Sequence, residues 1–509
     1  MSDYFSIDHL SSDLRGRALK GATVTVIAQG CTFIIQTVGT ILLARLLTPD
    51  DFGLVAMVLT FSLLLGNFGV NGFTEAIIQA RTIVHRQIST LFWVNMCFSV
   101  ALALLLIACA PLLVWFYKKP DLTPIIITIA ASNAMAGLAT LHLALLKRGM
   151  KFNRISANDV ITAIITCIIP IYLAWLGWGY WALVAKWMLT PMVTTAGAWI
   201  LCGWRPGPPS RNSDIGPMLK FAFNTYGNFV MNYFRRNLDK MLLGRVYGSQ
   251  QLGSYDRAYQ LSTMLPSQVF GSLNSVAIAS FSRLAHDPER YRFNFLTVLS
   301  VLALVGMPLS AALTLNSSDL IFLLLGPKWT TSAKIFCAFG PSIGVSMLYL
   351  THGWLHLSLG TPERWFRWGI LECMVTITAL LIGLSFGPVG VAIAYSTSFY
   401  FLTGPALWYA GRPIGLSIYF VWQTVWKFMV SAVLAGIVSW MMLYKTDAVY
   451  RNFEQCHAIS RIILSCSLLV VVYLLLIIAL HRGISPLTQA FGILREMFLS
   501  EDKKKERSK

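Results

Sequence analysis

Charged residues are scarce in this sequence. Only 12% of its 509 residues are Asp, Glu, Lys or Arg, whereas 56% are hydrophobic. A soluble domain carries about 25% charged residues, so the composition excludes an ordinary soluble enzyme and predicts a helical bundle in lipid. Acidic residues are scarcer than basic ones, 22 against 40, and the net charge is +18. Such a charge can indicate a nucleic-acid partner, but no soluble domain is there to hold one, so we expect no nucleic acid.

Metal-binding and catalytic motifs are also missing. The nine cysteines include no CxxC pair, and most of them lie in apolar runs, where cysteine packs as a small apolar residue. His352 and His356 share a helical face, but no third ligand is near them in the sequence. We therefore expect no metal and no cofactor. Long polar loops and paired carboxylates at useful spacing are absent too, which argues against a membrane-bound glycosyltransferase or polysaccharide polymerase and predicts that the chain is not an enzyme.

Long apolar runs, in contrast, fill the chain. A membrane-spanning helix needs about 20 mostly apolar residues. Windows of that size predict fourteen spans, at 20–44, 52–74, 89–116, 122–146, 156–176, 179–202, 218–243, 253–281, 294–315, 332–358, 366–386, 388–410, 420–444 and 460–481. The sequence therefore predicts an all-α membrane protein with about fourteen transmembrane helices.

The distribution of Lys and Arg predicts the orientation of these helices. If the N-terminus is cytoplasmic, most of the basic loop residues fall on the cytoplasmic side, as they do in membrane proteins generally. The opposite side then holds only Arg45, Lys118, Lys119, Arg245, Lys328, Lys445 and Arg451. We therefore predict that both termini are cytoplasmic. The basic tail at 486–498 is either an interfacial helix or a solvated segment.

Two stretches match at an offset of 200 residues. The segment ARLLTPDDFG occupies 44–53, and GRVYGSQQLG occupies 244–253. Each joins two predicted spans, and an even number of spans separates the two copies, so both copies point the same way. This pattern is typical of a transporter built as two lobes related by a parallel repeat.

A polar stripe follows the predicted span 218–243. At 100° per residue, one side of this helix carries Asn224, Asn228, Asn232, Arg235, Arg236, Asp239 and Lys240. A charge in the middle of a bilayer costs at least a few kcal/mol unless it faces water or a partner, so the stripe predicts an aqueous cavity. Arg235 and Asp239 can form an ion pair four residues apart. Arg236 and Lys240 have no carboxylate on their strip, and we therefore expect them to bind an anionic ligand.

Weaker stripes occur on three other spans. The first comprises Thr32, Gln36 and Thr40, the second Asn67, Asn71 and Glu75, and the third Asp256 and Arg257. Shifted by 200, Gln36 coincides with Arg236, so both lobes are expected to line one cavity. Lys186 and Lys427 are further cations within spans, which either snorkel to the interface or line the cavity.

Six segments occur in an order that identifies a family. They are LARLLTPDDFGLVAMV, EAIIQAR, STLFWVN, ALLKRGMKF, RRNLDKMLLGRVYG and LGSYDRAYQL. In this order they resemble the Wzx-type polysaccharide flippases of the multidrug/oligosaccharidyl-lipid/polysaccharide exporter superfamily, and most closely the branch that serves exopolysaccharides such as colanic acid. The resemblance covers roughly residues 15–480.

The resemblance implies an architecture and a substrate. It implies two six-helix lobes and two further C-terminal helices in a bacterial inner membrane. The implied substrate is an oligosaccharide linked to undecaprenyl pyrophosphate, moved by alternating access and coupled to an ion gradient or the membrane potential. Implied partners are membrane lipid, a polysaccharide polymerase and export machinery. A multidrug exporter or a peptidoglycan-precursor flippase of the same superfamily stays open as an alternative, although a net basic cavity argues against the drug exporter.

These arguments give one set of boundaries and one set of site residues. The predicted segments are a cytoplasmic N-terminus at 1–19, a first lobe at 20–202, a linker at 203–217, a second lobe at 218–410, two further helices at 411–481 and a basic tail at 482–509. The candidate substrate-binding residues are Arg236, Lys240, Arg257, Arg235, Asn232, Gln36, Lys186 and Lys427, and the candidates for ion pairing or coupling are Asp239, Asp256 and Glu75.

Overall fold

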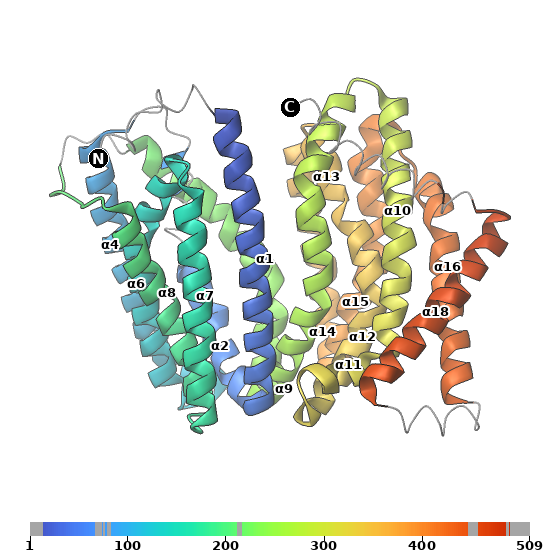
Figure 1. Cartoon of the computed structure of the whole chain (residues 1–509), viewed down its shortest axis with the longest axis horizontal. Coiled ribbons are helices and arrows are strands. Elements are labelled where there is room, and N and C mark those ends of the chain that lie inside the picture. Colours follow the sequence, from blue (N-terminus) through green and yellow to red (C-terminus); the bar gives the residue numbers. More distant parts are fainter. Residues whose placement is uncertain are drawn as a thin grey trace. The chain divides into compact units, whose positions relative to one another are not determined.

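The described part of the chain is helical nearly throughout (Figure 1). The computed structural model describes residues 14–66, 74, 77–78, 83–210, 216–445, 457–484 and 488. Its residues divide into two compact units, Met1–Asp256 and Arg257–Lys509. Each unit is described separately below.

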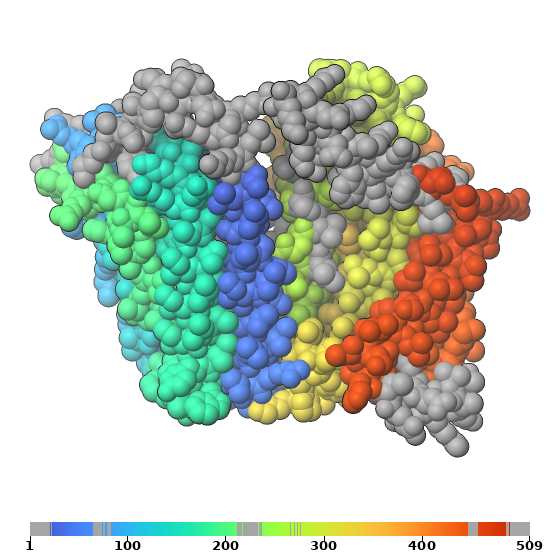
Figure 2. Space-filling model, viewed as in Figure 1, coloured from blue at the N-terminus to red at the C-terminus, as the bar shows by residue number. Residues whose placement is uncertain are grey.

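The first unit is a bundle organised around α6. Its helices are α1 (Leu14–Leu46), α2 (Pro49–Gly66), α4 (His85–Ala108), α5 (Ala110–Tyr117), α6 (Leu122–Arg148), α7 (Phe152–Trp175), α8 (Tyr180–Cys202) and the beginning of α9 (Gly216–Leu284). Helices α4 and α8 pack against α6, and α1 packs along α7. The blue surface of α1 lies beside the teal surface of α7 in Figure 2. Buried Leu141, Leu145 and Trp204 belong to one of its apolar cores.

The second unit is a bundle organised around α10, α12 and α15. After the end of α9 it contains α10 (Pro288–Leu315), α11 (Ser317–Leu324), η3 (Pro327–Trp329), α12 (Thr330–Leu350), α13 (His352–Ser358), α14 (Pro362–Leu384), α15 (Gly387–Gly411), η4 (Arg412–Ile414), α16 (Ile418–Tyr444) and α18 (Ala458–His481). Helix α12 packs against α10 and α15, and α16 packs between α10 and α18. The two C-terminal helices, α16 and α18, thus belong to the core of this unit.

The fourteen predicted spans coincide with helices wherever the structure describes them. Within the described ranges, nine helical stretches are long and apolar enough to cross a membrane, and α12 with α13 forms one of them. The five other predicted spans fall on α2, α8, the two arms of α9 and α15. The prediction of an all-α membrane protein is confirmed. The predicted interfacial helix at 486–498 lies outside the described residues, apart from Thr488.

Large apolar side chains on the outer faces suit a lipid environment. On α7, Ile161, Ile168 and Trp175 are each more than half exposed, and so are Ile463 and Leu475 on α18. Soluble monomers rarely expose apolar surface in continuous patches. Because these residues lie on predicted spans, we interpret the two faces as lipid-facing.

The extended segment 203–210 is fastened along the beginning of α4. Ser89 Oγ accepts the Gly207 N–H at 3.0 Å, and Thr90 Oγ1 accepts the Ser210 N–H at 3.1 Å. Trp93 Nε1 donates to the Gly207 carbonyl at 2.9 Å. Hydroxyl and indole groups thus satisfy a backbone that has no helical partners. The first part of the predicted linker 203–217 is therefore an ordered segment that is hydrogen-bonded to the first unit.

The 200-residue repeat places two matching helix junctions in the structure. In the first copy, Thr48 begins α2: its N–H and hydroxyl both donate to Asp51 Oδ2, at 2.9 and 2.6 Å, and Pro49 follows at the first helical position. In the second copy, the aligned residue is Gly248, whose φ of 79° and ψ of −178° divide α9 into two arms. A positive φ is easily reached only by glycine, so Gly248 replaces a capped junction with a sharp kink.

The two copies of the repeat touch each other reciprocally. A Cβ added at Gly53 would collide with the Ser249 carbonyl, and one added at Gly253 would collide with the Pro49 carbonyl. Under the 200-residue offset, 49 corresponds to 249 and 53 to 253. The contact is therefore self-complementary, as in a two-fold symmetric interface. Ser249 Oγ also donates to Asp50 Oδ1. The sequence repeat thus corresponds to a local two-fold contact at which two backbones approach closely.

This contact predicts that neither glycine tolerates a side chain. We expect Gly53→Ala and Gly253→Ala each to destabilise the protein by about 1–3 kcal/mol, because the obstructing atoms are backbone carbonyls that cannot rotate away. The measurement is the melting temperature of the purified protein in detergent. Gly30→Ala and Gly271→Ala are matched controls, since nothing lies within 4 Å of a Cβ at either position. Equal melting temperatures for all four variants would contradict the close backbone contact.

Candidate functional site

A buried charged cluster spans the kink in α9. Asp239 and Lys240 come from the arm before Gly248, and Asp256 comes from the arm after it. Lys240 Nζ lies 2.8 Å from Asp256 Oδ1. Asp239 and Asp256 are each only 4% exposed. The kink turns the chain so that residues sixteen positions apart in the sequence become neighbours.

Each carboxylate of this cluster has polar partners. The Asp239 carboxylate accepts the Tyr255 hydroxyl at 2.8 Å and the Lys240 backbone N–H at 2.8 Å. Nearby, the Tyr233 hydroxyl donates to the Thr60 carbonyl at 3.0 Å and so ties α9 to α2. A buried ion remains charged only where its partners compensate for lost hydration. The cluster can therefore keep its charges within a membrane-spanning bundle.

The expectation that Lys240 lacks a carboxylate partner is wrong. Its counter-ion is Asp256, which the sequence pattern had placed on a separate stripe. Helical periodicity relates only residues within one continuous helix, whereas the kink at Gly248 brings the next arm back against the first. Asp256 itself was a candidate for ion pairing, and the structure gives it that role.

Several predicted site residues fall outside the described side chains. On the stripe of α9 these are Asn224, Asn228, Asn232, Arg235 and Arg236, and in the sequence after α2 they are Asn67, Asn71 and Glu75. The expected Arg235–Asp239 pair is among the interactions left untested. Assignments to these residues stay predictions.

The other candidates lie on separate helices. Gln36 is exposed on α1, and Lys186 is half-buried on α8 of the first unit. Arg257, on the second arm of α9, and Lys427, on α16, are half-buried in the second unit. The structure therefore brings together Asp239, Lys240 and Asp256.

Sequence reasoning missed two participants of the first unit. Tyr255 donates to Asp239, and Ser249 donates to Asp50. Neither pair follows a helical spacing, because each bond crosses the kink or joins the two repeat copies. The alignment of the repeat contained one usable signal, since it placed Ser249 opposite the first turn of α2.

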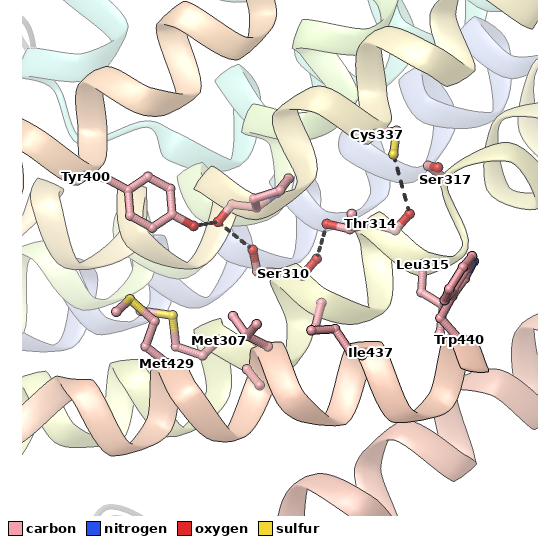
Figure 3. Close-up of a pocket in the computed structure, with 15 residues that line it drawn as sticks. Met307, Ser310, Thr314, Leu315, Ser317, Cys337, Tyr400, Met429, Ile437 and Trp440 are labelled. Carbon is pink, nitrogen blue, oxygen red and sulfur yellow. Dashed lines mark hydrogen bonds between the residues drawn. The ribbon is translucent and has the colours of Figure 1, made fainter. Parts of the chain in front are cut away.

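The second unit contains a cavity of about 440 Å³ (Figure 3). It is bounded by α10, α11, α12, α15 and α16. Its lining residues are Met307, Ser310, Ala311, Thr314, Leu315, Ser317, Cys337, Pro341, Tyr400, Met429, Ala432, Val433, Gly436, Ile437 and Trp440. The set contains no Asp, Glu, Lys, Arg or His. Val433, Ile437 and Trp440 are exposed on α16, so the cavity opens toward the exposed side of that helix.

Three hydroxyl groups in the cavity wall, those of Ser310, Thr314 and Tyr400, donate to backbone carbonyls. Ser310 Oγ donates to the Gly340 carbonyl at 2.5 Å, and Thr314 Oγ1 donates to the Ser310 carbonyl at 2.7 Å. Tyr400 donates to the Pro341 carbonyl at 2.7 Å, as Figure 3 shows. A polar ligand would have to compete with these bonds. The cavity therefore suits an apolar occupant.

The pair His352 and His356 is packed among aromatic side chains. His356 Nδ1 lies 3.1 Å from Thr361 Oγ1, and its ring is parallel to that of Trp365. Among the residues that the structure describes, no group of three or more His, Cys, Asp or Glu could hold a metal ion. The surroundings of these two histidines are those of a packed core.

Comparison with known proteins places the chain in a family. The family model described as "Polysaccharide biosynthesis protein" matches residues 42–334. The lipopolysaccharide biosynthesis protein WzxC of Escherichia coli is 24% identical over 75% of this chain and 78% of its own length. The succinoglycan biosynthesis transport protein ExoT of Rhizobium meliloti is 22% identical over 70% and 73%. The teichuronic acid biosynthesis protein TuaB of Bacillus subtilis is 25% identical over 87% and 92%.

Solved structures support the fold. The lipid II flippase MurJ, in an inward closed conformation, superposes with a TM-score of 0.70 at 15% identity over 90% of this chain and 99% of its own. An inward-facing multidrug transporter of the MOP superfamily gives 0.57 at 10% identity over 77% and 98%. Because the family model covers more than half of the sequence, this chain belongs to the polysaccharide biosynthesis protein family, as the Wzx-like motifs predicted.

Proposed function

We propose that this protein moves a lipid-linked oligosaccharide across the bacterial inner membrane for exopolysaccharide or lipopolysaccharide synthesis. The observation that carries the proposal is a buried charged cluster in a membrane-spanning bundle of this family. Relatives named for succinoglycan transport and for lipopolysaccharide, teichuronic acid and amylovoran biosynthesis support it. The chain is then a transporter and not an enzyme, and the cargo is the undecaprenyl-pyrophosphate-linked repeat unit.

Alternating access is the mechanism that suits the repeat. The reciprocal contact of the two copies relies on glycines and on backbone atoms, with the Ser249–Asp50 hydrogen bond beside it. Such a contact buries few side chains. Breaking it therefore requires less free energy than separating two surfaces of a packed core. We propose that this contact closes one end of the transport path and opens when the cargo has passed.

The pyrophosphate is assigned to cations of the α9 stripe. Arg236 is the first candidate, because arginine grips phosphate oxygens through two parallel hydrogen bonds. Arg235, Arg257, Lys186, Lys427, Asn232 and Gln36 are further candidates along the path. Lys240, which is paired with Asp256, would reach the substrate only by exchanging that partner. We assign Asp239, Asp256 and Glu75 to ion pairing or to coupling with an ion.

The hydrocarbon tail of the cargo is assigned to the cavity of the second unit. Its lining is mostly apolar, the hydroxyls of Ser310, Thr314 and Tyr400 donate to backbone carbonyls, and its mouth lies beside exposed Val433 and Ile437. A chain in the bilayer could therefore enter sideways from lipid without leaving an apolar environment. Small residues, Ala311, Ala432 and Gly436, provide the room.

The proposed location is the inner membrane with both termini cytoplasmic. A polysaccharide polymerase and export machinery would use the product on the far side. Membrane lipid surrounds the lipid-facing helices.

The Lys240–Asp256 pair gives the first test. Lys240→Ala should reduce the amount of membrane-inserted protein, because breaking a buried pair costs about 3–5 kcal/mol. The double variant Lys240→Ala with Asp256→Asn should recover insertion, since it removes both charges.

Arg236→Ala should insert normally but abolish polysaccharide export, and Arg236→Lys should restore export in part. Export is measured per unit of inserted protein in a strain lacking its own flippase.

Two outcomes would change this assignment. Insertion of Lys240→Ala at the normal level would remove the structural role of the pair. Normal export from both Arg236→Ala and the Lys240/Asp256 double variant would exclude these cations from the site and leave Arg257, Lys186 and Lys427.

The cavity gives a second test. Gly436→Leu should fill part of the cavity and lower export severalfold while the protein still inserts. Gly436→Ala is the matched control, because its Cβ would meet Ala311 at an ordinary 3.7 Å. Gly369→Leu makes the same change on α14, where a Cβ meets nothing within 4 Å. Full export from Gly436→Leu would show that the cavity takes no part in transport.

Orientation gives a third test. Asn153 and Lys118 are exposed and lie at predicted opposite membrane surfaces. In a cysteine-free background, an impermeant maleimide added from the periplasm should label Lys118→Cys but not Asn153→Cys. The reverse pattern would invert the proposed topology.

A further inference from the structure

Three arginines of the second unit are stacked on aromatic rings at one end of the bundle. Arg412 Cζ lies 4.0 Å from the ring centroid of Trp408. Arg364 Cζ lies 4.8 Å from that of Tyr409, and Arg292 Cζ lies 5.3 Å from that of Phe420. The arginines come from η4, α14 and α10 respectively. None of them was singled out by the sequence, because they belong to three separate loops or helix ends.

Hydrogen bonds and a shared ring draw these arginines to one turn, 408–415. Arg412 Cζ is also 5.7 Å from the Tyr409 centroid, so it shares this ring with Arg364. Arg364 Nη2 donates to the Tyr409 carbonyl at 2.6 Å. Arg292 Nη1 donates to the Gly415 carbonyl at 3.4 Å, and the Gly415 N–H in turn donates to the Arg412 carbonyl at 3.1 Å. The three side chains are therefore oriented around a single turn.

Among the residues that the structure describes, no ion pair involves these three arginines. The ion pairs of the described residues lie elsewhere, at Lys240–Asp256, Arg290–Asp287 and Arg461–Asp319. A guanidinium carries five N–H donors, and the backbone contacts use one donor of Arg292 and one of Arg364. Three preoriented cations thus keep most of their donors, which is the arrangement that binds phosphate oxygens.

Exposed apolar side chains occur at the beginnings of the two helices that adjoin this turn, α10 and α16. Phe293, beside Arg292 on α10, is 71% exposed, and Tyr419 and Trp422 at the beginning of α16 are 63% and 51% exposed. Aromatic residues gather at the membrane interface, where the headgroups of lipids lie. A free anion would gain nothing from these rings, whereas the glycerol and hydrocarbon parts of a lipid would cover them. Charge and apolar surface together indicate an amphipathic anion.

We propose that Arg292, Arg364 and Arg412 form a binding site for the headgroup of an anionic phospholipid. The lipid phosphate accepts hydrogen bonds from the guanidinium groups, and its acyl chains lie against the exposed side chains of α10 and α16. Basic clusters at helix ends attract anionic headgroups in this way. The site shares no residue with the charged cluster on α9, and the lipid stabilises the junction of α15 with α16 through the turn that it covers.

The test compares the melting temperature of the purified full-length protein in neutral detergent with added lipids. Phosphatidylglycerol should raise the melting temperature of the wild type more than phosphatidylcholine does, and inorganic phosphate at the same concentration should have no effect. In the variant Arg292→Ala with Arg412→Ala, the apparent affinity for phosphatidylglycerol should fall roughly tenfold or more. The variant Arg292→Lys with Arg412→Lys should give an intermediate loss, because lysine keeps the charge but not the stacked planar group.

Arg290→Ala is the matched control. It removes a positive charge from the same helix end, but Arg290 is only loosely paired with Asp287 and stacks on no ring in the described structure. This variant should keep the wild-type response. The proposal is overturned if both lipids stabilise the wild type equally, if inorganic phosphate reproduces the effect, or if Arg290→Ala loses as much affinity as the double lysine variant.

Discussion

Hydrocarbon offers no hydrogen bonds, and this constraint shapes the buried charged groups in both units. In a bilayer, backbone and side-chain polar groups must find partners within the protein. In the first unit, the Asp239 carboxylate accepts hydrogen bonds from the Tyr255 hydroxyl and a backbone N–H. The Asp256 carboxylate pairs with the Lys240 ammonium. In the second unit, Arg461 pairs with Asp319, and the Ser310 hydroxyl donates to the Gly340 carbonyl. Polar side chains therefore connect helices that apolar packing alone would leave free to slide.

The sequence allowed the helices and the repeat to be predicted, since both depend on local patterns. Apolar runs place each span regardless of what lies opposite, and α10 and α16 begin and end within six residues of their predicted limits. The offset of 200 residues carried three-dimensional information as well, because Gly53 and Gly253 lie in a reciprocal contact. Because the contact is self-complementary, the equivalent position in each copy must be a residue without a side chain.

The site was less predictable, because periodicity stops at a kink. Helical spacing grouped Lys240 with Arg236, whereas the structure pairs Lys240 with Asp256 across Gly248. Nothing in the spacing of Asp239 and Tyr255 indicates that they touch. The cavity of the second unit was equally hidden, because its lining residues come from five helices and are ordinary members of apolar runs. Patterns along one helix identify which residues need partners, but only the fold decides which partners they receive.

The charged cluster of the first unit and the cavity of the second are different environments, and the proposed amphipathic cargo would use both. A pyrophosphate is stabilised by cations with available donors, whereas a polyprenyl chain is best placed where every donor is already satisfied. The first unit concentrates buried charge around the kink of α9, and the second contains a cavity lined without any Asp, Glu, Lys, Arg or His. If one site offered both environments, its cations would be desolvated by the hydrocarbon tail at a cost of several kcal/mol for each ion. In the proposed assignment, the separation of the two environments avoids this cost.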